Sequence, residues 1–241
     1  MKRAALKWLL TGGLSLSLAG LILAQKPSAP EKAGAEKAAG SGTGAGQEPD
    51  YSAELPRIPP LSVEEELKSF EVQPGFRVEL VAAEPLLKDP VAFAFNAAGQ
   101  LFVVEMCDYS EQETEHLGSI ALLVDTDRDG RMDQRSTFAE KLSWPTAIWP
   151  WKDGAIVAEP PQLIWLRDTN GDGVSDKREV WYEGFGRTNV QGLVNSLRWT
   201  VDGYIEGATS SSGAELKSPA DANLAQQPIT LRGRDFVIDP L

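Results

Sequence analysis

The stretch VAFAFNAAGQLFVVE, residues 91–105, carries the pattern that decides the fold. Apolar and small side chains alternate over Val91–Phe95, a turn pair follows at Ala98-Gly99, and apolar residues resume over Leu101–Glu105. Two apolar runs joined by a glycine turn are typical of a β-hairpin. We therefore predict two antiparallel strands in this stretch.

The same pattern recurs at residues 146–159 and 195–208, so the turn glycines Gly99, Gly154 and Gly203 lie 55 and 49 residues apart. A four-stranded propeller blade repeats about every 40–50 residues. One blade cannot bury both of its faces, and blades therefore stack around a central axis. The sequence predicts an all-β protein containing a partial β-propeller of roughly three to four blades. A β-sandwich is the alternative for this strand spacing, but it would not repeat in this way.

Local patterns predict further elements. Ser62 followed by Glu65 is a capping box, which predicts a short helix at Val63–Ser69. No other segment has a convincing helical period. Additional strands are predicted at Phe76–Val81, Ile120–Val124, Leu163–Leu166, Glu179–Tyr182 and Phe236–Ile238.

The chain begins with a predicted targeting segment, residues 1–24, in which a basic start precedes the uncharged run Trp8–Leu23. This run is short for a membrane span, which needs about 20 apolar residues. We expect cleavage after Ala24 and an exported, periplasmic or extracellular protein without a membrane span; a retained membrane tether is the alternative. Residues 25–58 are rich in Ala, Gly, Pro, Glu and Lys and are predicted to be a disordered linker. Residues 59–241 then form the N-terminal part of a propeller domain.

Composition excludes several classes of function. The formal net charge of -12 argues against a nucleic-acid partner, which needs clustered Lys and Arg. The single cysteine, Cys107, rules out an intrachain disulfide. A Cys/His zinc site cannot be assembled from one Cys and one His without carboxylates, and a Ser-His-Asp triad would have to use His116, which no G-x-S-x-G elbow accompanies. Both residues are expected on the surface or in packing.

The strongest motif is DTNGDGVSDKRE, residues 168–179, which matches the pattern of a calcium-binding loop. Calcium prefers six to eight oxygen ligands, and alternating acids on a tight loop supply them. Gly173 permits the sharp turn. The predicted ligands are Asp168, Asn170, Asp172, the carbonyl of Val174, Asp176, and Glu179 as a bidentate closing ligand.

A second copy of this motif is DTDRDGRMD, residues 125–133. Its predicted ligands are Asp125, Asp127, Asp129, the carbonyl of Arg131, and Asp133. Ser136 stands at the twelfth position, so this loop lacks the closing carboxylate. Because strands precede both loops, we expect structural calcium sites between blade strands. A plain acidic turn is the alternative, since Asp-Gly is a favoured turn pair.

Two other groups of residues are candidates for ligand recognition. Asn189, Gln191, Asn195 and Arg198 combine amides with a guanidinium and suit hydroxyl or carboxylate groups on a central face. They suit structural bridging between blades equally well. Six tryptophans between Trp144 and Trp199 suggest either a sugar-stacking surface or, as the favoured interpretation, packing between blades.

Several segments together resemble one family. They are Phe76–Pro85, Val91–Phe95, Val103–Met106, Leu142–Thr146, the two Asp-rich loops, Asn189–Gln191, Val194–Trp199 and Leu231–Phe236. The set resembles the membrane-bound dehydrogenase domain of planctomycete-type bacteria, which is similar to six-bladed glucose/sorbosone dehydrogenase propellers. The resemblance covers about Pro59 to Leu241 and implies a dehydrogenase acting on carbohydrates or alcohols, with an electron-transfer partner. A quinone or haem c would come from a further region or a partner, because this chain has no Cys-x-x-Cys-His motif.

The sequence therefore leaves two alternative hypotheses for the function. The first is an extracytoplasmic, calcium-binding propeller that forms the N-terminal part of a sugar or alcohol dehydrogenase, with this chain alone inactive. The second is a non-catalytic, calcium-stabilised propeller that binds glycan or protein. The scarcity of histidine favours the second function, and the resemblance favours the first.

Overall fold

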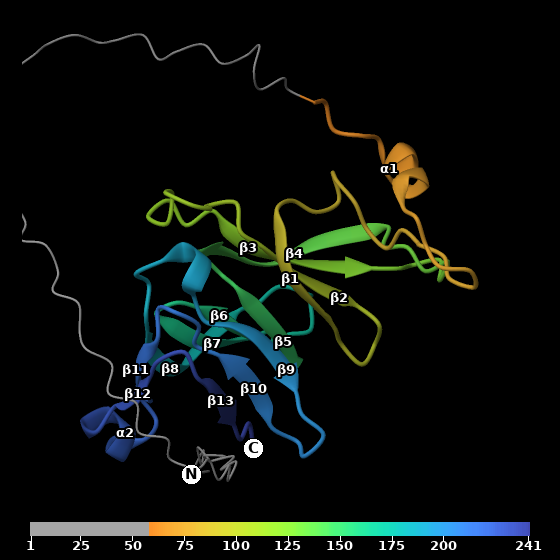
Figure 1. Ribbon diagram of the computed structural model, residues 1–241. Coiled ribbons are helices and arrows are strands. Elements are labelled where there is room, and N and C mark those ends of the chain that lie inside the picture. Colours follow the sequence, from red (N-terminus) through yellow and green to blue (C-terminus); the bar gives the residue numbers. More distant parts are fainter. Residues whose placement is uncertain (1–57) are drawn as a thin grey trace, which may run out of the picture. The chain divides into compact units, whose positions relative to one another are not determined.

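The computed structural model describes residues 58–241 (Figure 1). The predicted targeting segment and nearly all of the predicted linker lie outside the described residues. The described part contains thirteen β-strands, two short α-helices and one 3-10 helix, and every strand pair is antiparallel. The all-β prediction is confirmed, while the three sheets of the described part do not close into a ring.

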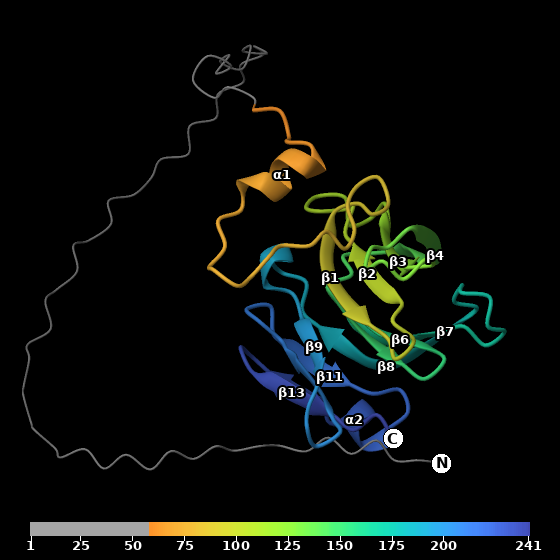
Figure 2. The same cartoon turned by 90° about the vertical axis from the view of Figure 1, so that its right-hand side faces the viewer.

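The strands form three sheets (Figure 2). The first sheet is a four-stranded meander of β1 (Pro90–Phe95), β2 (Leu101–Glu105), β3 (Gly118–Val124) and β4 (Gln134–Leu142). The second sheet repeats this meander with β5 (Ala147–Trp151), β6 (Gly154–Glu159), β7 (Gln162–Arg167) and β8 (Lys177–Phe185), and is extended by β11 (Ala214–Lys217) and β12 (Ile229–Leu231). The third sheet has the order β13-β10-β9, from β9 (Asn195–Trp199), β10 (Ile205–Ala208) and β13 (Asp235–Ile238).

The hairpin predicted at residues 91–105 is confirmed as β1 and β2, with Phe95 paired to Leu101. The Asn96 side chain closes the turn, because its Oδ1 accepts hydrogen bonds from the N–H groups of Ala98 and Gln100. Gly99 has φ +79°, a left-handed conformation that costs glycine little. The glycine of this turn thus has a local physical cause.

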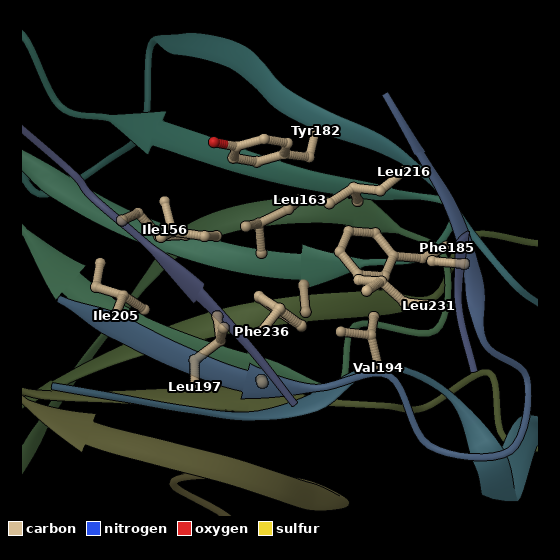
Figure 3. Close-up of a cluster of buried hydrophobic side chains, with 14 residues drawn as sticks. Ile156, Leu163, Tyr182, Phe185, Val194, Leu197, Ile205, Leu216, Leu231 and Phe236 are labelled. Atoms are coloured by element: carbon tan, nitrogen blue, oxygen red, sulfur yellow. The ribbon is translucent and has the colours of Figure 1, made fainter. Parts of the chain in front are cut away.

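Two apolar layers hold the three sheets together. Between the first and second sheets, Phe102, Ile120 and Phe138 pack against Ile148 and Val157. Between the second and third sheets lies a larger cluster, including Ile156, Leu163, Tyr182, Leu197 and Phe236 (Figure 3). The leading strand of each repeat contacts the next one, β1 with β5 and β5 with β9. Each sheet of this series therefore buries a face against its successor.

A buried glutamate recurs at the end of the second strand in both meanders. Glu105 ends β2 and is 2% exposed, and its carboxylate accepts from the N–H of Lys88 at 2.9 Å and pairs with Arg135 at 2.7 Å. Glu159 ends β6, accepts from the N–H of Ser143 at 2.9 Å, and pairs with Arg178 at 2.7 Å. The first and second sheets thus each contain an equivalent buried ion pair, in addition to having the same strand order.

One predicted strand is wrong. Phe76–Val81 is not part of a sheet, and its side chains are mostly exposed. Its alternation of apolar and polar residues is that of a strand, but no neighbouring strand of the described part pairs with it. A strand needs a partner as well as a pattern.

The structure also contains elements that the sequence patterns did not predict. Strand β4 was missed because it is largely polar, with only Phe138 and Leu142 buried. Strands β11 and β12 are short and carry weak patterns. Helix α2 (Ala222–Gln226) has five residues and depends on its N-cap, where Asp221 accepts from the N–H groups of Asn223 and Leu224. The helix predicted at Val63–Ser69 is confirmed as α1.

Candidate metal centres in two Asp-rich loops

The two predicted calcium-type loops connect equivalent strands. Residues 125–133 join β3 to β4 in the first sheet, and residues 168–176 join β7 to β8 in the second. Equivalent residues of the two loops lie 43 positions apart. Because each loop joins neighbouring antiparallel strands, its two ends are held in register by the strand ladders.

The first loop gathers carboxylates around its backbone. Asp125 accepts hydrogen bonds from the N–H groups of Arg128 at 2.6 Å, Asp129 at 3.2 Å and Gly130 at 2.9 Å. These bonds wrap the chain around the Asp125 carboxylate. Asp125, Asp127 and Asp133 then bring one carboxylate oxygen each to within 4.8 Å of one another, so the three could hold a metal ion.

The second loop repeats this wrapping. Asp168 accepts from the N–H groups of Gly171 at 2.6 Å, Asp172 at 3.1 Å and Gly173 at 2.8 Å. Asn170 stands where the first loop has Asp127, and its Oδ1 accepts from the N–H of Asp172. The second loop therefore offers one carboxylate fewer than the first at this position.

Equivalent side chains close the end of each loop. Asp133 accepts from the N–H and Oγ1 of Thr126, and Asp176 accepts from the same two groups of Thr169. Asp129 accepts from the N–H of Arg131, and Asp172 accepts from the N–H of Val174. The predicted carbonyl ligands at Arg131 and Val174 thus belong to residues whose amides are held by loop carboxylates.

The first loop stabilises the ionised form of its leading acid. Burial is the largest single influence on Asp125 and raises its pKa, but the backbone N–H groups of Gly130, Arg128 and Asp129 together outweigh burial. The pKa of Asp125 therefore lies below its ordinary value. An ionised carboxylate is the form that binds a hard cation.

Glu179, the predicted closing ligand, lies on β8 and has other partners. Its carboxylate pairs with Lys177 at 2.8 Å and with Arg167 at 2.9 Å, and these two cations hold the pKa of Glu179 below its ordinary value. Arg167 also pairs with Asp153 at 2.6 Å. The structure therefore places Glu179 in a charge network on the sheet, with its carboxylate engaged by cations.

Both loops contact a segment outside their own hairpin. The N–H of Met132 in the first loop donates to the carbonyl of Val81 at 2.8 Å. The N–H of Ser175 in the second loop donates to the carbonyl of Phe138 on β4 at 2.7 Å. Met132 and Ser175 are equivalent, so each loop attaches to the chain that precedes its own sheet.

A cleft of about 580 Å³ lies beside the second loop. Phe95 at the end of β1, Trp149 and Trp151 on β5, and Asp168 contribute to its lining. Trp151 stacks on Trp199 with ring centroids 5.3 Å apart. Four of the six clustered tryptophans, Trp149, Trp151, Trp165 and Trp181, pack against the core between the second and third sheets, in agreement with the packing interpretation.

The four predicted recognition residues are divided among separate contacts. Asn189 caps the 3-10 helix η1 (Val190–Gly192) by accepting from the N–H of Gln191, and the Gln191 amide donates to the Tyr109 hydroxyl at 3.3 Å. Asn195 donates to the carbonyl of Leu193. Arg198 pairs with Glu206 on the neighbouring strand β10 at 2.7 Å. Asn189 and Gln191 thus lie together, whereas Arg198 serves a cross-strand ion pair.

Sequence reasoning missed a buried polar cluster near Gln191. Asp108 is 0% exposed and accepts from the N–H of Trp144 at 2.9 Å, while its Oδ1 has no hydrogen-bond partner among the described residues. Arg187 donates to Ser143 Oγ at 2.8 Å and lies over the Trp144 ring. No sequence motif marks this cluster.

Comparison with known proteins gives a family and no curated relative. A search of curated proteins found no match. Within the described residues, no helix is long and apolar enough to cross a membrane. Residues 62–241, most of the chain and all three sheets, match the family described as a domain of unknown function, DUF7133. The chain therefore belongs to the DUF7133 family.

Proposed function

We propose that this chain is the N-terminal part of an extracytoplasmic, calcium-binding β-propeller of the sugar or alcohol dehydrogenase type. The observation that carries the proposal is the repeat of whole sheets with equivalent Asp-rich loops. Propeller blades are four-stranded antiparallel meanders stacked face to face. The two four-stranded meanders, and the contacts of β1 with β5 and of β5 with β9, are what successive blades would produce.

The segment before β1 supports the same architecture. Lys88, Asp89 and Pro90 align with Ser143, Trp144 and Pro145 before β5. Lys88 and Ser143 each donate to the buried glutamate of the sheet that follows, and Asp89 and Trp144 both have positive φ, 41° and 49°. Val81 accepts from the first loop as Phe138 on β4 accepts from the second. In a propeller, residues 76–87 would therefore correspond to the fourth strand of a preceding blade.

Calcium is the cation that fits the two loops best. Carboxylate oxygens of Asp125, Asp127 and Asp133 converge in the first loop, and the second loop carries carboxylates and the Asn170 amide oxygen, which are ligands that calcium prefers. Asp125, Asp127 and Asp133 would hold the ion in the first loop. A bound ion would neutralise the gathered carboxylates and stabilise the folded state through its binding free energy.

The catalytic half of the proposal rests on the resemblance and concerns the end of the sheets that carries Asn189 and Gln191. There the Gln191 amide and the Tyr109 hydroxyl present hydrogen-bonding groups for a hydroxylated substrate. Covalent haem c needs two thiols, and the sequence has only Cys107, so haem does not fit this chain's residues. A quinone or haem would act as the electron acceptor from a partner or a further region.

A second candidate is a calcium-stabilised propeller that binds glycan or protein without catalysis. The favouring observation is that Arg198 and Asn195, proposed for a substrate site, are engaged in contacts within the chain. Turnover of a sugar and alcohol panel by a complete propeller that contains this chain, with an artificial electron acceptor and with and without added quinone, separates the candidates. Turnover above that of an Asn189→Ala, Gln191→Ala double variant supports the dehydrogenase. Saturable glycan binding without turnover supports the binder.

The calcium sites are tested by thermal unfolding of the full chain in chelator and in rising calcium. A site filled at 100 times its Kd should add about 2.7 kcal/mol to the free energy of unfolding. Asp125→Asn and Asp168→Asn should each remove the response of one loop, whereas Asp235→Asn, an exposed carboxylate on β13, should leave both responses intact. A melting temperature that is the same in chelator and in calcium would refute the sites.

A further inference from the structure

We propose that the cleft beside the second Asp-rich loop, between the first and second sheets, binds a short neutral oligosaccharide. Its volume of about 580 Å³ lies within the range of pockets that hold small ligands. The inference deepens the second candidate function and rests on it, because it locates the glycan that this candidate would bind.

The cleft lies at the end of the sheets opposite the Tyr109–Gln191 contact. Strand β1 ends in the turn at residues 96–100, which lines the cleft, and β2 returns from that turn toward Tyr109. The turn between β5 and β6 and the second Asp-rich loop also line the cleft. A ligand in the cleft would therefore leave the proposed catalytic end of the sheets free.

The buried part of the lining is apolar and fixed by packing. Phe102, Leu122 and Phe138 of the first sheet contribute to it and are 4%, 5% and 2% exposed. The rings of Phe102 and Phe138 meet edge to face, with centroids 5.0 Å apart. On the side of the second sheet, Trp151 is partly buried and is held by its stack on Trp199. The cleft thus offers a preformed aromatic and aliphatic surface.

The exposed part of the lining is polar. Gln100 accepts from the Asn96 side chain at 2.8 Å, and its own amide nitrogen makes no hydrogen bond to a described residue. Lys152 is exposed and holds its ammonium 5.1 Å from the centroid of the Trp151 ring. Asp168 adds a carboxylate. Hydrogen-bond donors and acceptors therefore surround the apolar surface.

This combination selects a neutral sugar among the common classes of ligand. A pyranose ring carries C–H groups on its faces and hydroxyl groups around its perimeter, so it contacts apolar surface and hydrogen-bonds at the same time. A lipid chain would desolvate the polar groups without pairing them. A polyanion such as a nucleic acid would be repelled by Asp168 and by the formal net charge of -12.

Isothermal titration of the full chain with cellohexaose, at a fixed calcium concentration, tests the proposal. Cellohexaose is neutral, and its equatorial hydroxyls leave both faces of each ring apolar. The wild type should bind it saturably. Ala97→Leu should raise the Kd about tenfold by adding bulk to the lining, and Lys152→Met should raise it by a similar factor by removing a donor. Both residues are exposed, so the variants should keep the wild-type melting temperature.

Each variant has a matched control. Ala98→Leu adds the same bulk to the same turn, at an exposed residue that is not part of the cleft lining. Lys141→Met removes an exposed lysine of β4 that, like Lys152, has a positive φ. Both controls should bind cellohexaose with the wild-type Kd.

The outcomes separate the cleft from the proposed function. A wild type that does not bind cellohexaose saturably overturns the cleft site. Binding that survives both Ala97→Leu and Lys152→Met also overturns it, while keeping the second candidate function with its glycan elsewhere. Turnover by a complete propeller concerns the other end of the sheets and should be unchanged by Ala97→Leu, so the dehydrogenase and the cleft can fail independently.

Discussion

Asp125 and Asp168 lie 43 residues apart and make the same three backbone hydrogen bonds in their respective loops. Each aspartate accepts from the residues three, four and five positions ahead of it. Glycine stands at the fifth position of both, and Arg128 adopts φ +65° where Gly171 has +80°. The two loops therefore keep one conformation although their sequences differ.

The buried ion pair of the first sheet should be sensitive to loss of its cation. Arg135→Met leaves the Glu105 carboxylate, 2% exposed, without its guanidinium. Removing one partner of a buried pair typically costs about 3–5 kcal/mol, and some of that loss is offset here because Ser119 and Lys88 still donate to Glu105. We expect a loss of about 3 kcal/mol in urea unfolding. Lys141→Met on the same strand is the control, and a loss equal to that of the control would contradict the prediction.

The ion pairs of Arg167 should make the free energy of unfolding depend on pH in the acid range. Arg167 is the main cause of the lowered pKa of Asp153, and Lys177 together with Arg167 lowers the pKa of Glu179, so both groups bind protons more weakly in the folded state than in the unfolded one. Their contribution is present above the unfolded pKa values of about 3.9 and 4.3, and is lost as pH falls through the lower folded values. Arg167→Gln should lower the urea midpoint of unfolding at pH 7 and lower it less near pH 3. Equal shifts at the two pH values would refute this origin.

Gly99 in the β1–β2 turn and Gly154 at the start of β6 should differ in their tolerance of alanine. A Cβ on Gly154 would lie 1.9 Å from the carbonyl oxygen of Leu166, which belongs to the β6–β7 ladder, so the backbone must move. At Gly99 no atom lies within 4 Å of the added Cβ, and only the positive φ is unfavourable. We expect Gly99→Ala to cost about 1–2 kcal/mol, and Gly154→Ala to cost more, at about 3 kcal/mol or above. Chemical denaturation of both variants gives the comparison, and equal costs would argue against the clash.

Phe93 and Ile148 occupy equivalent positions of β1 and β5 but differ in solvent exposure. Ile148 is 3% exposed beneath the first sheet, and Phe93 is 68% exposed. Truncating a buried Ile to Ala costs about 2–5 kcal/mol, so Ile148→Ala should lie in that range. Phe93→Ala should change the free energy of unfolding by less than about 0.5 kcal/mol. A large cost at Phe93 would mean that another sheet covers this face in solution.

Strand patterns predicted most of the strands, including the edge strands β1 and β13, and missed β4, β11 and β12. The hairpins of β1–β2 and β5–β6 were predicted because they are bounded by glycine turns and carry buried apolar residues. Outer strand β4 escaped because only two of its side chains are buried, so its sequence has little hydrophobic period. Phe76–Val81 has the period and lacks the partner. A strand can therefore be predicted only where its buried positions give the sequence an apolar period.

The candidate loops were predicted from local sequence because their conformation is made by local hydrogen bonds. Each Asp-x-Asp/Asn alternation supplies acceptors for amides two to five residues ahead. The role of Glu179 was less predictable, because its partner Arg167 reaches it across the β7–β8 ladder. The cluster around Asp108 and Trp144 is assembled from residues 36 positions apart and has no sequence signature.

The hydrogen bond from Met132 to Val81 has a consequence for the unit that is repeated. If the unit is defined by hydrogen-bonded strands, it consists of the four strands from β1 to β4. As sequence, the unit starts earlier, with the run that leads through Leu87 and Pro90 into β1 and recurs through Leu142 and Pro145 into β5. The copied module therefore straddles two sheets, joining the outer strand of one to the inner strands of the next. Each module is bound to its neighbour by the peptide chain itself, so neighbouring sheets should unfold together.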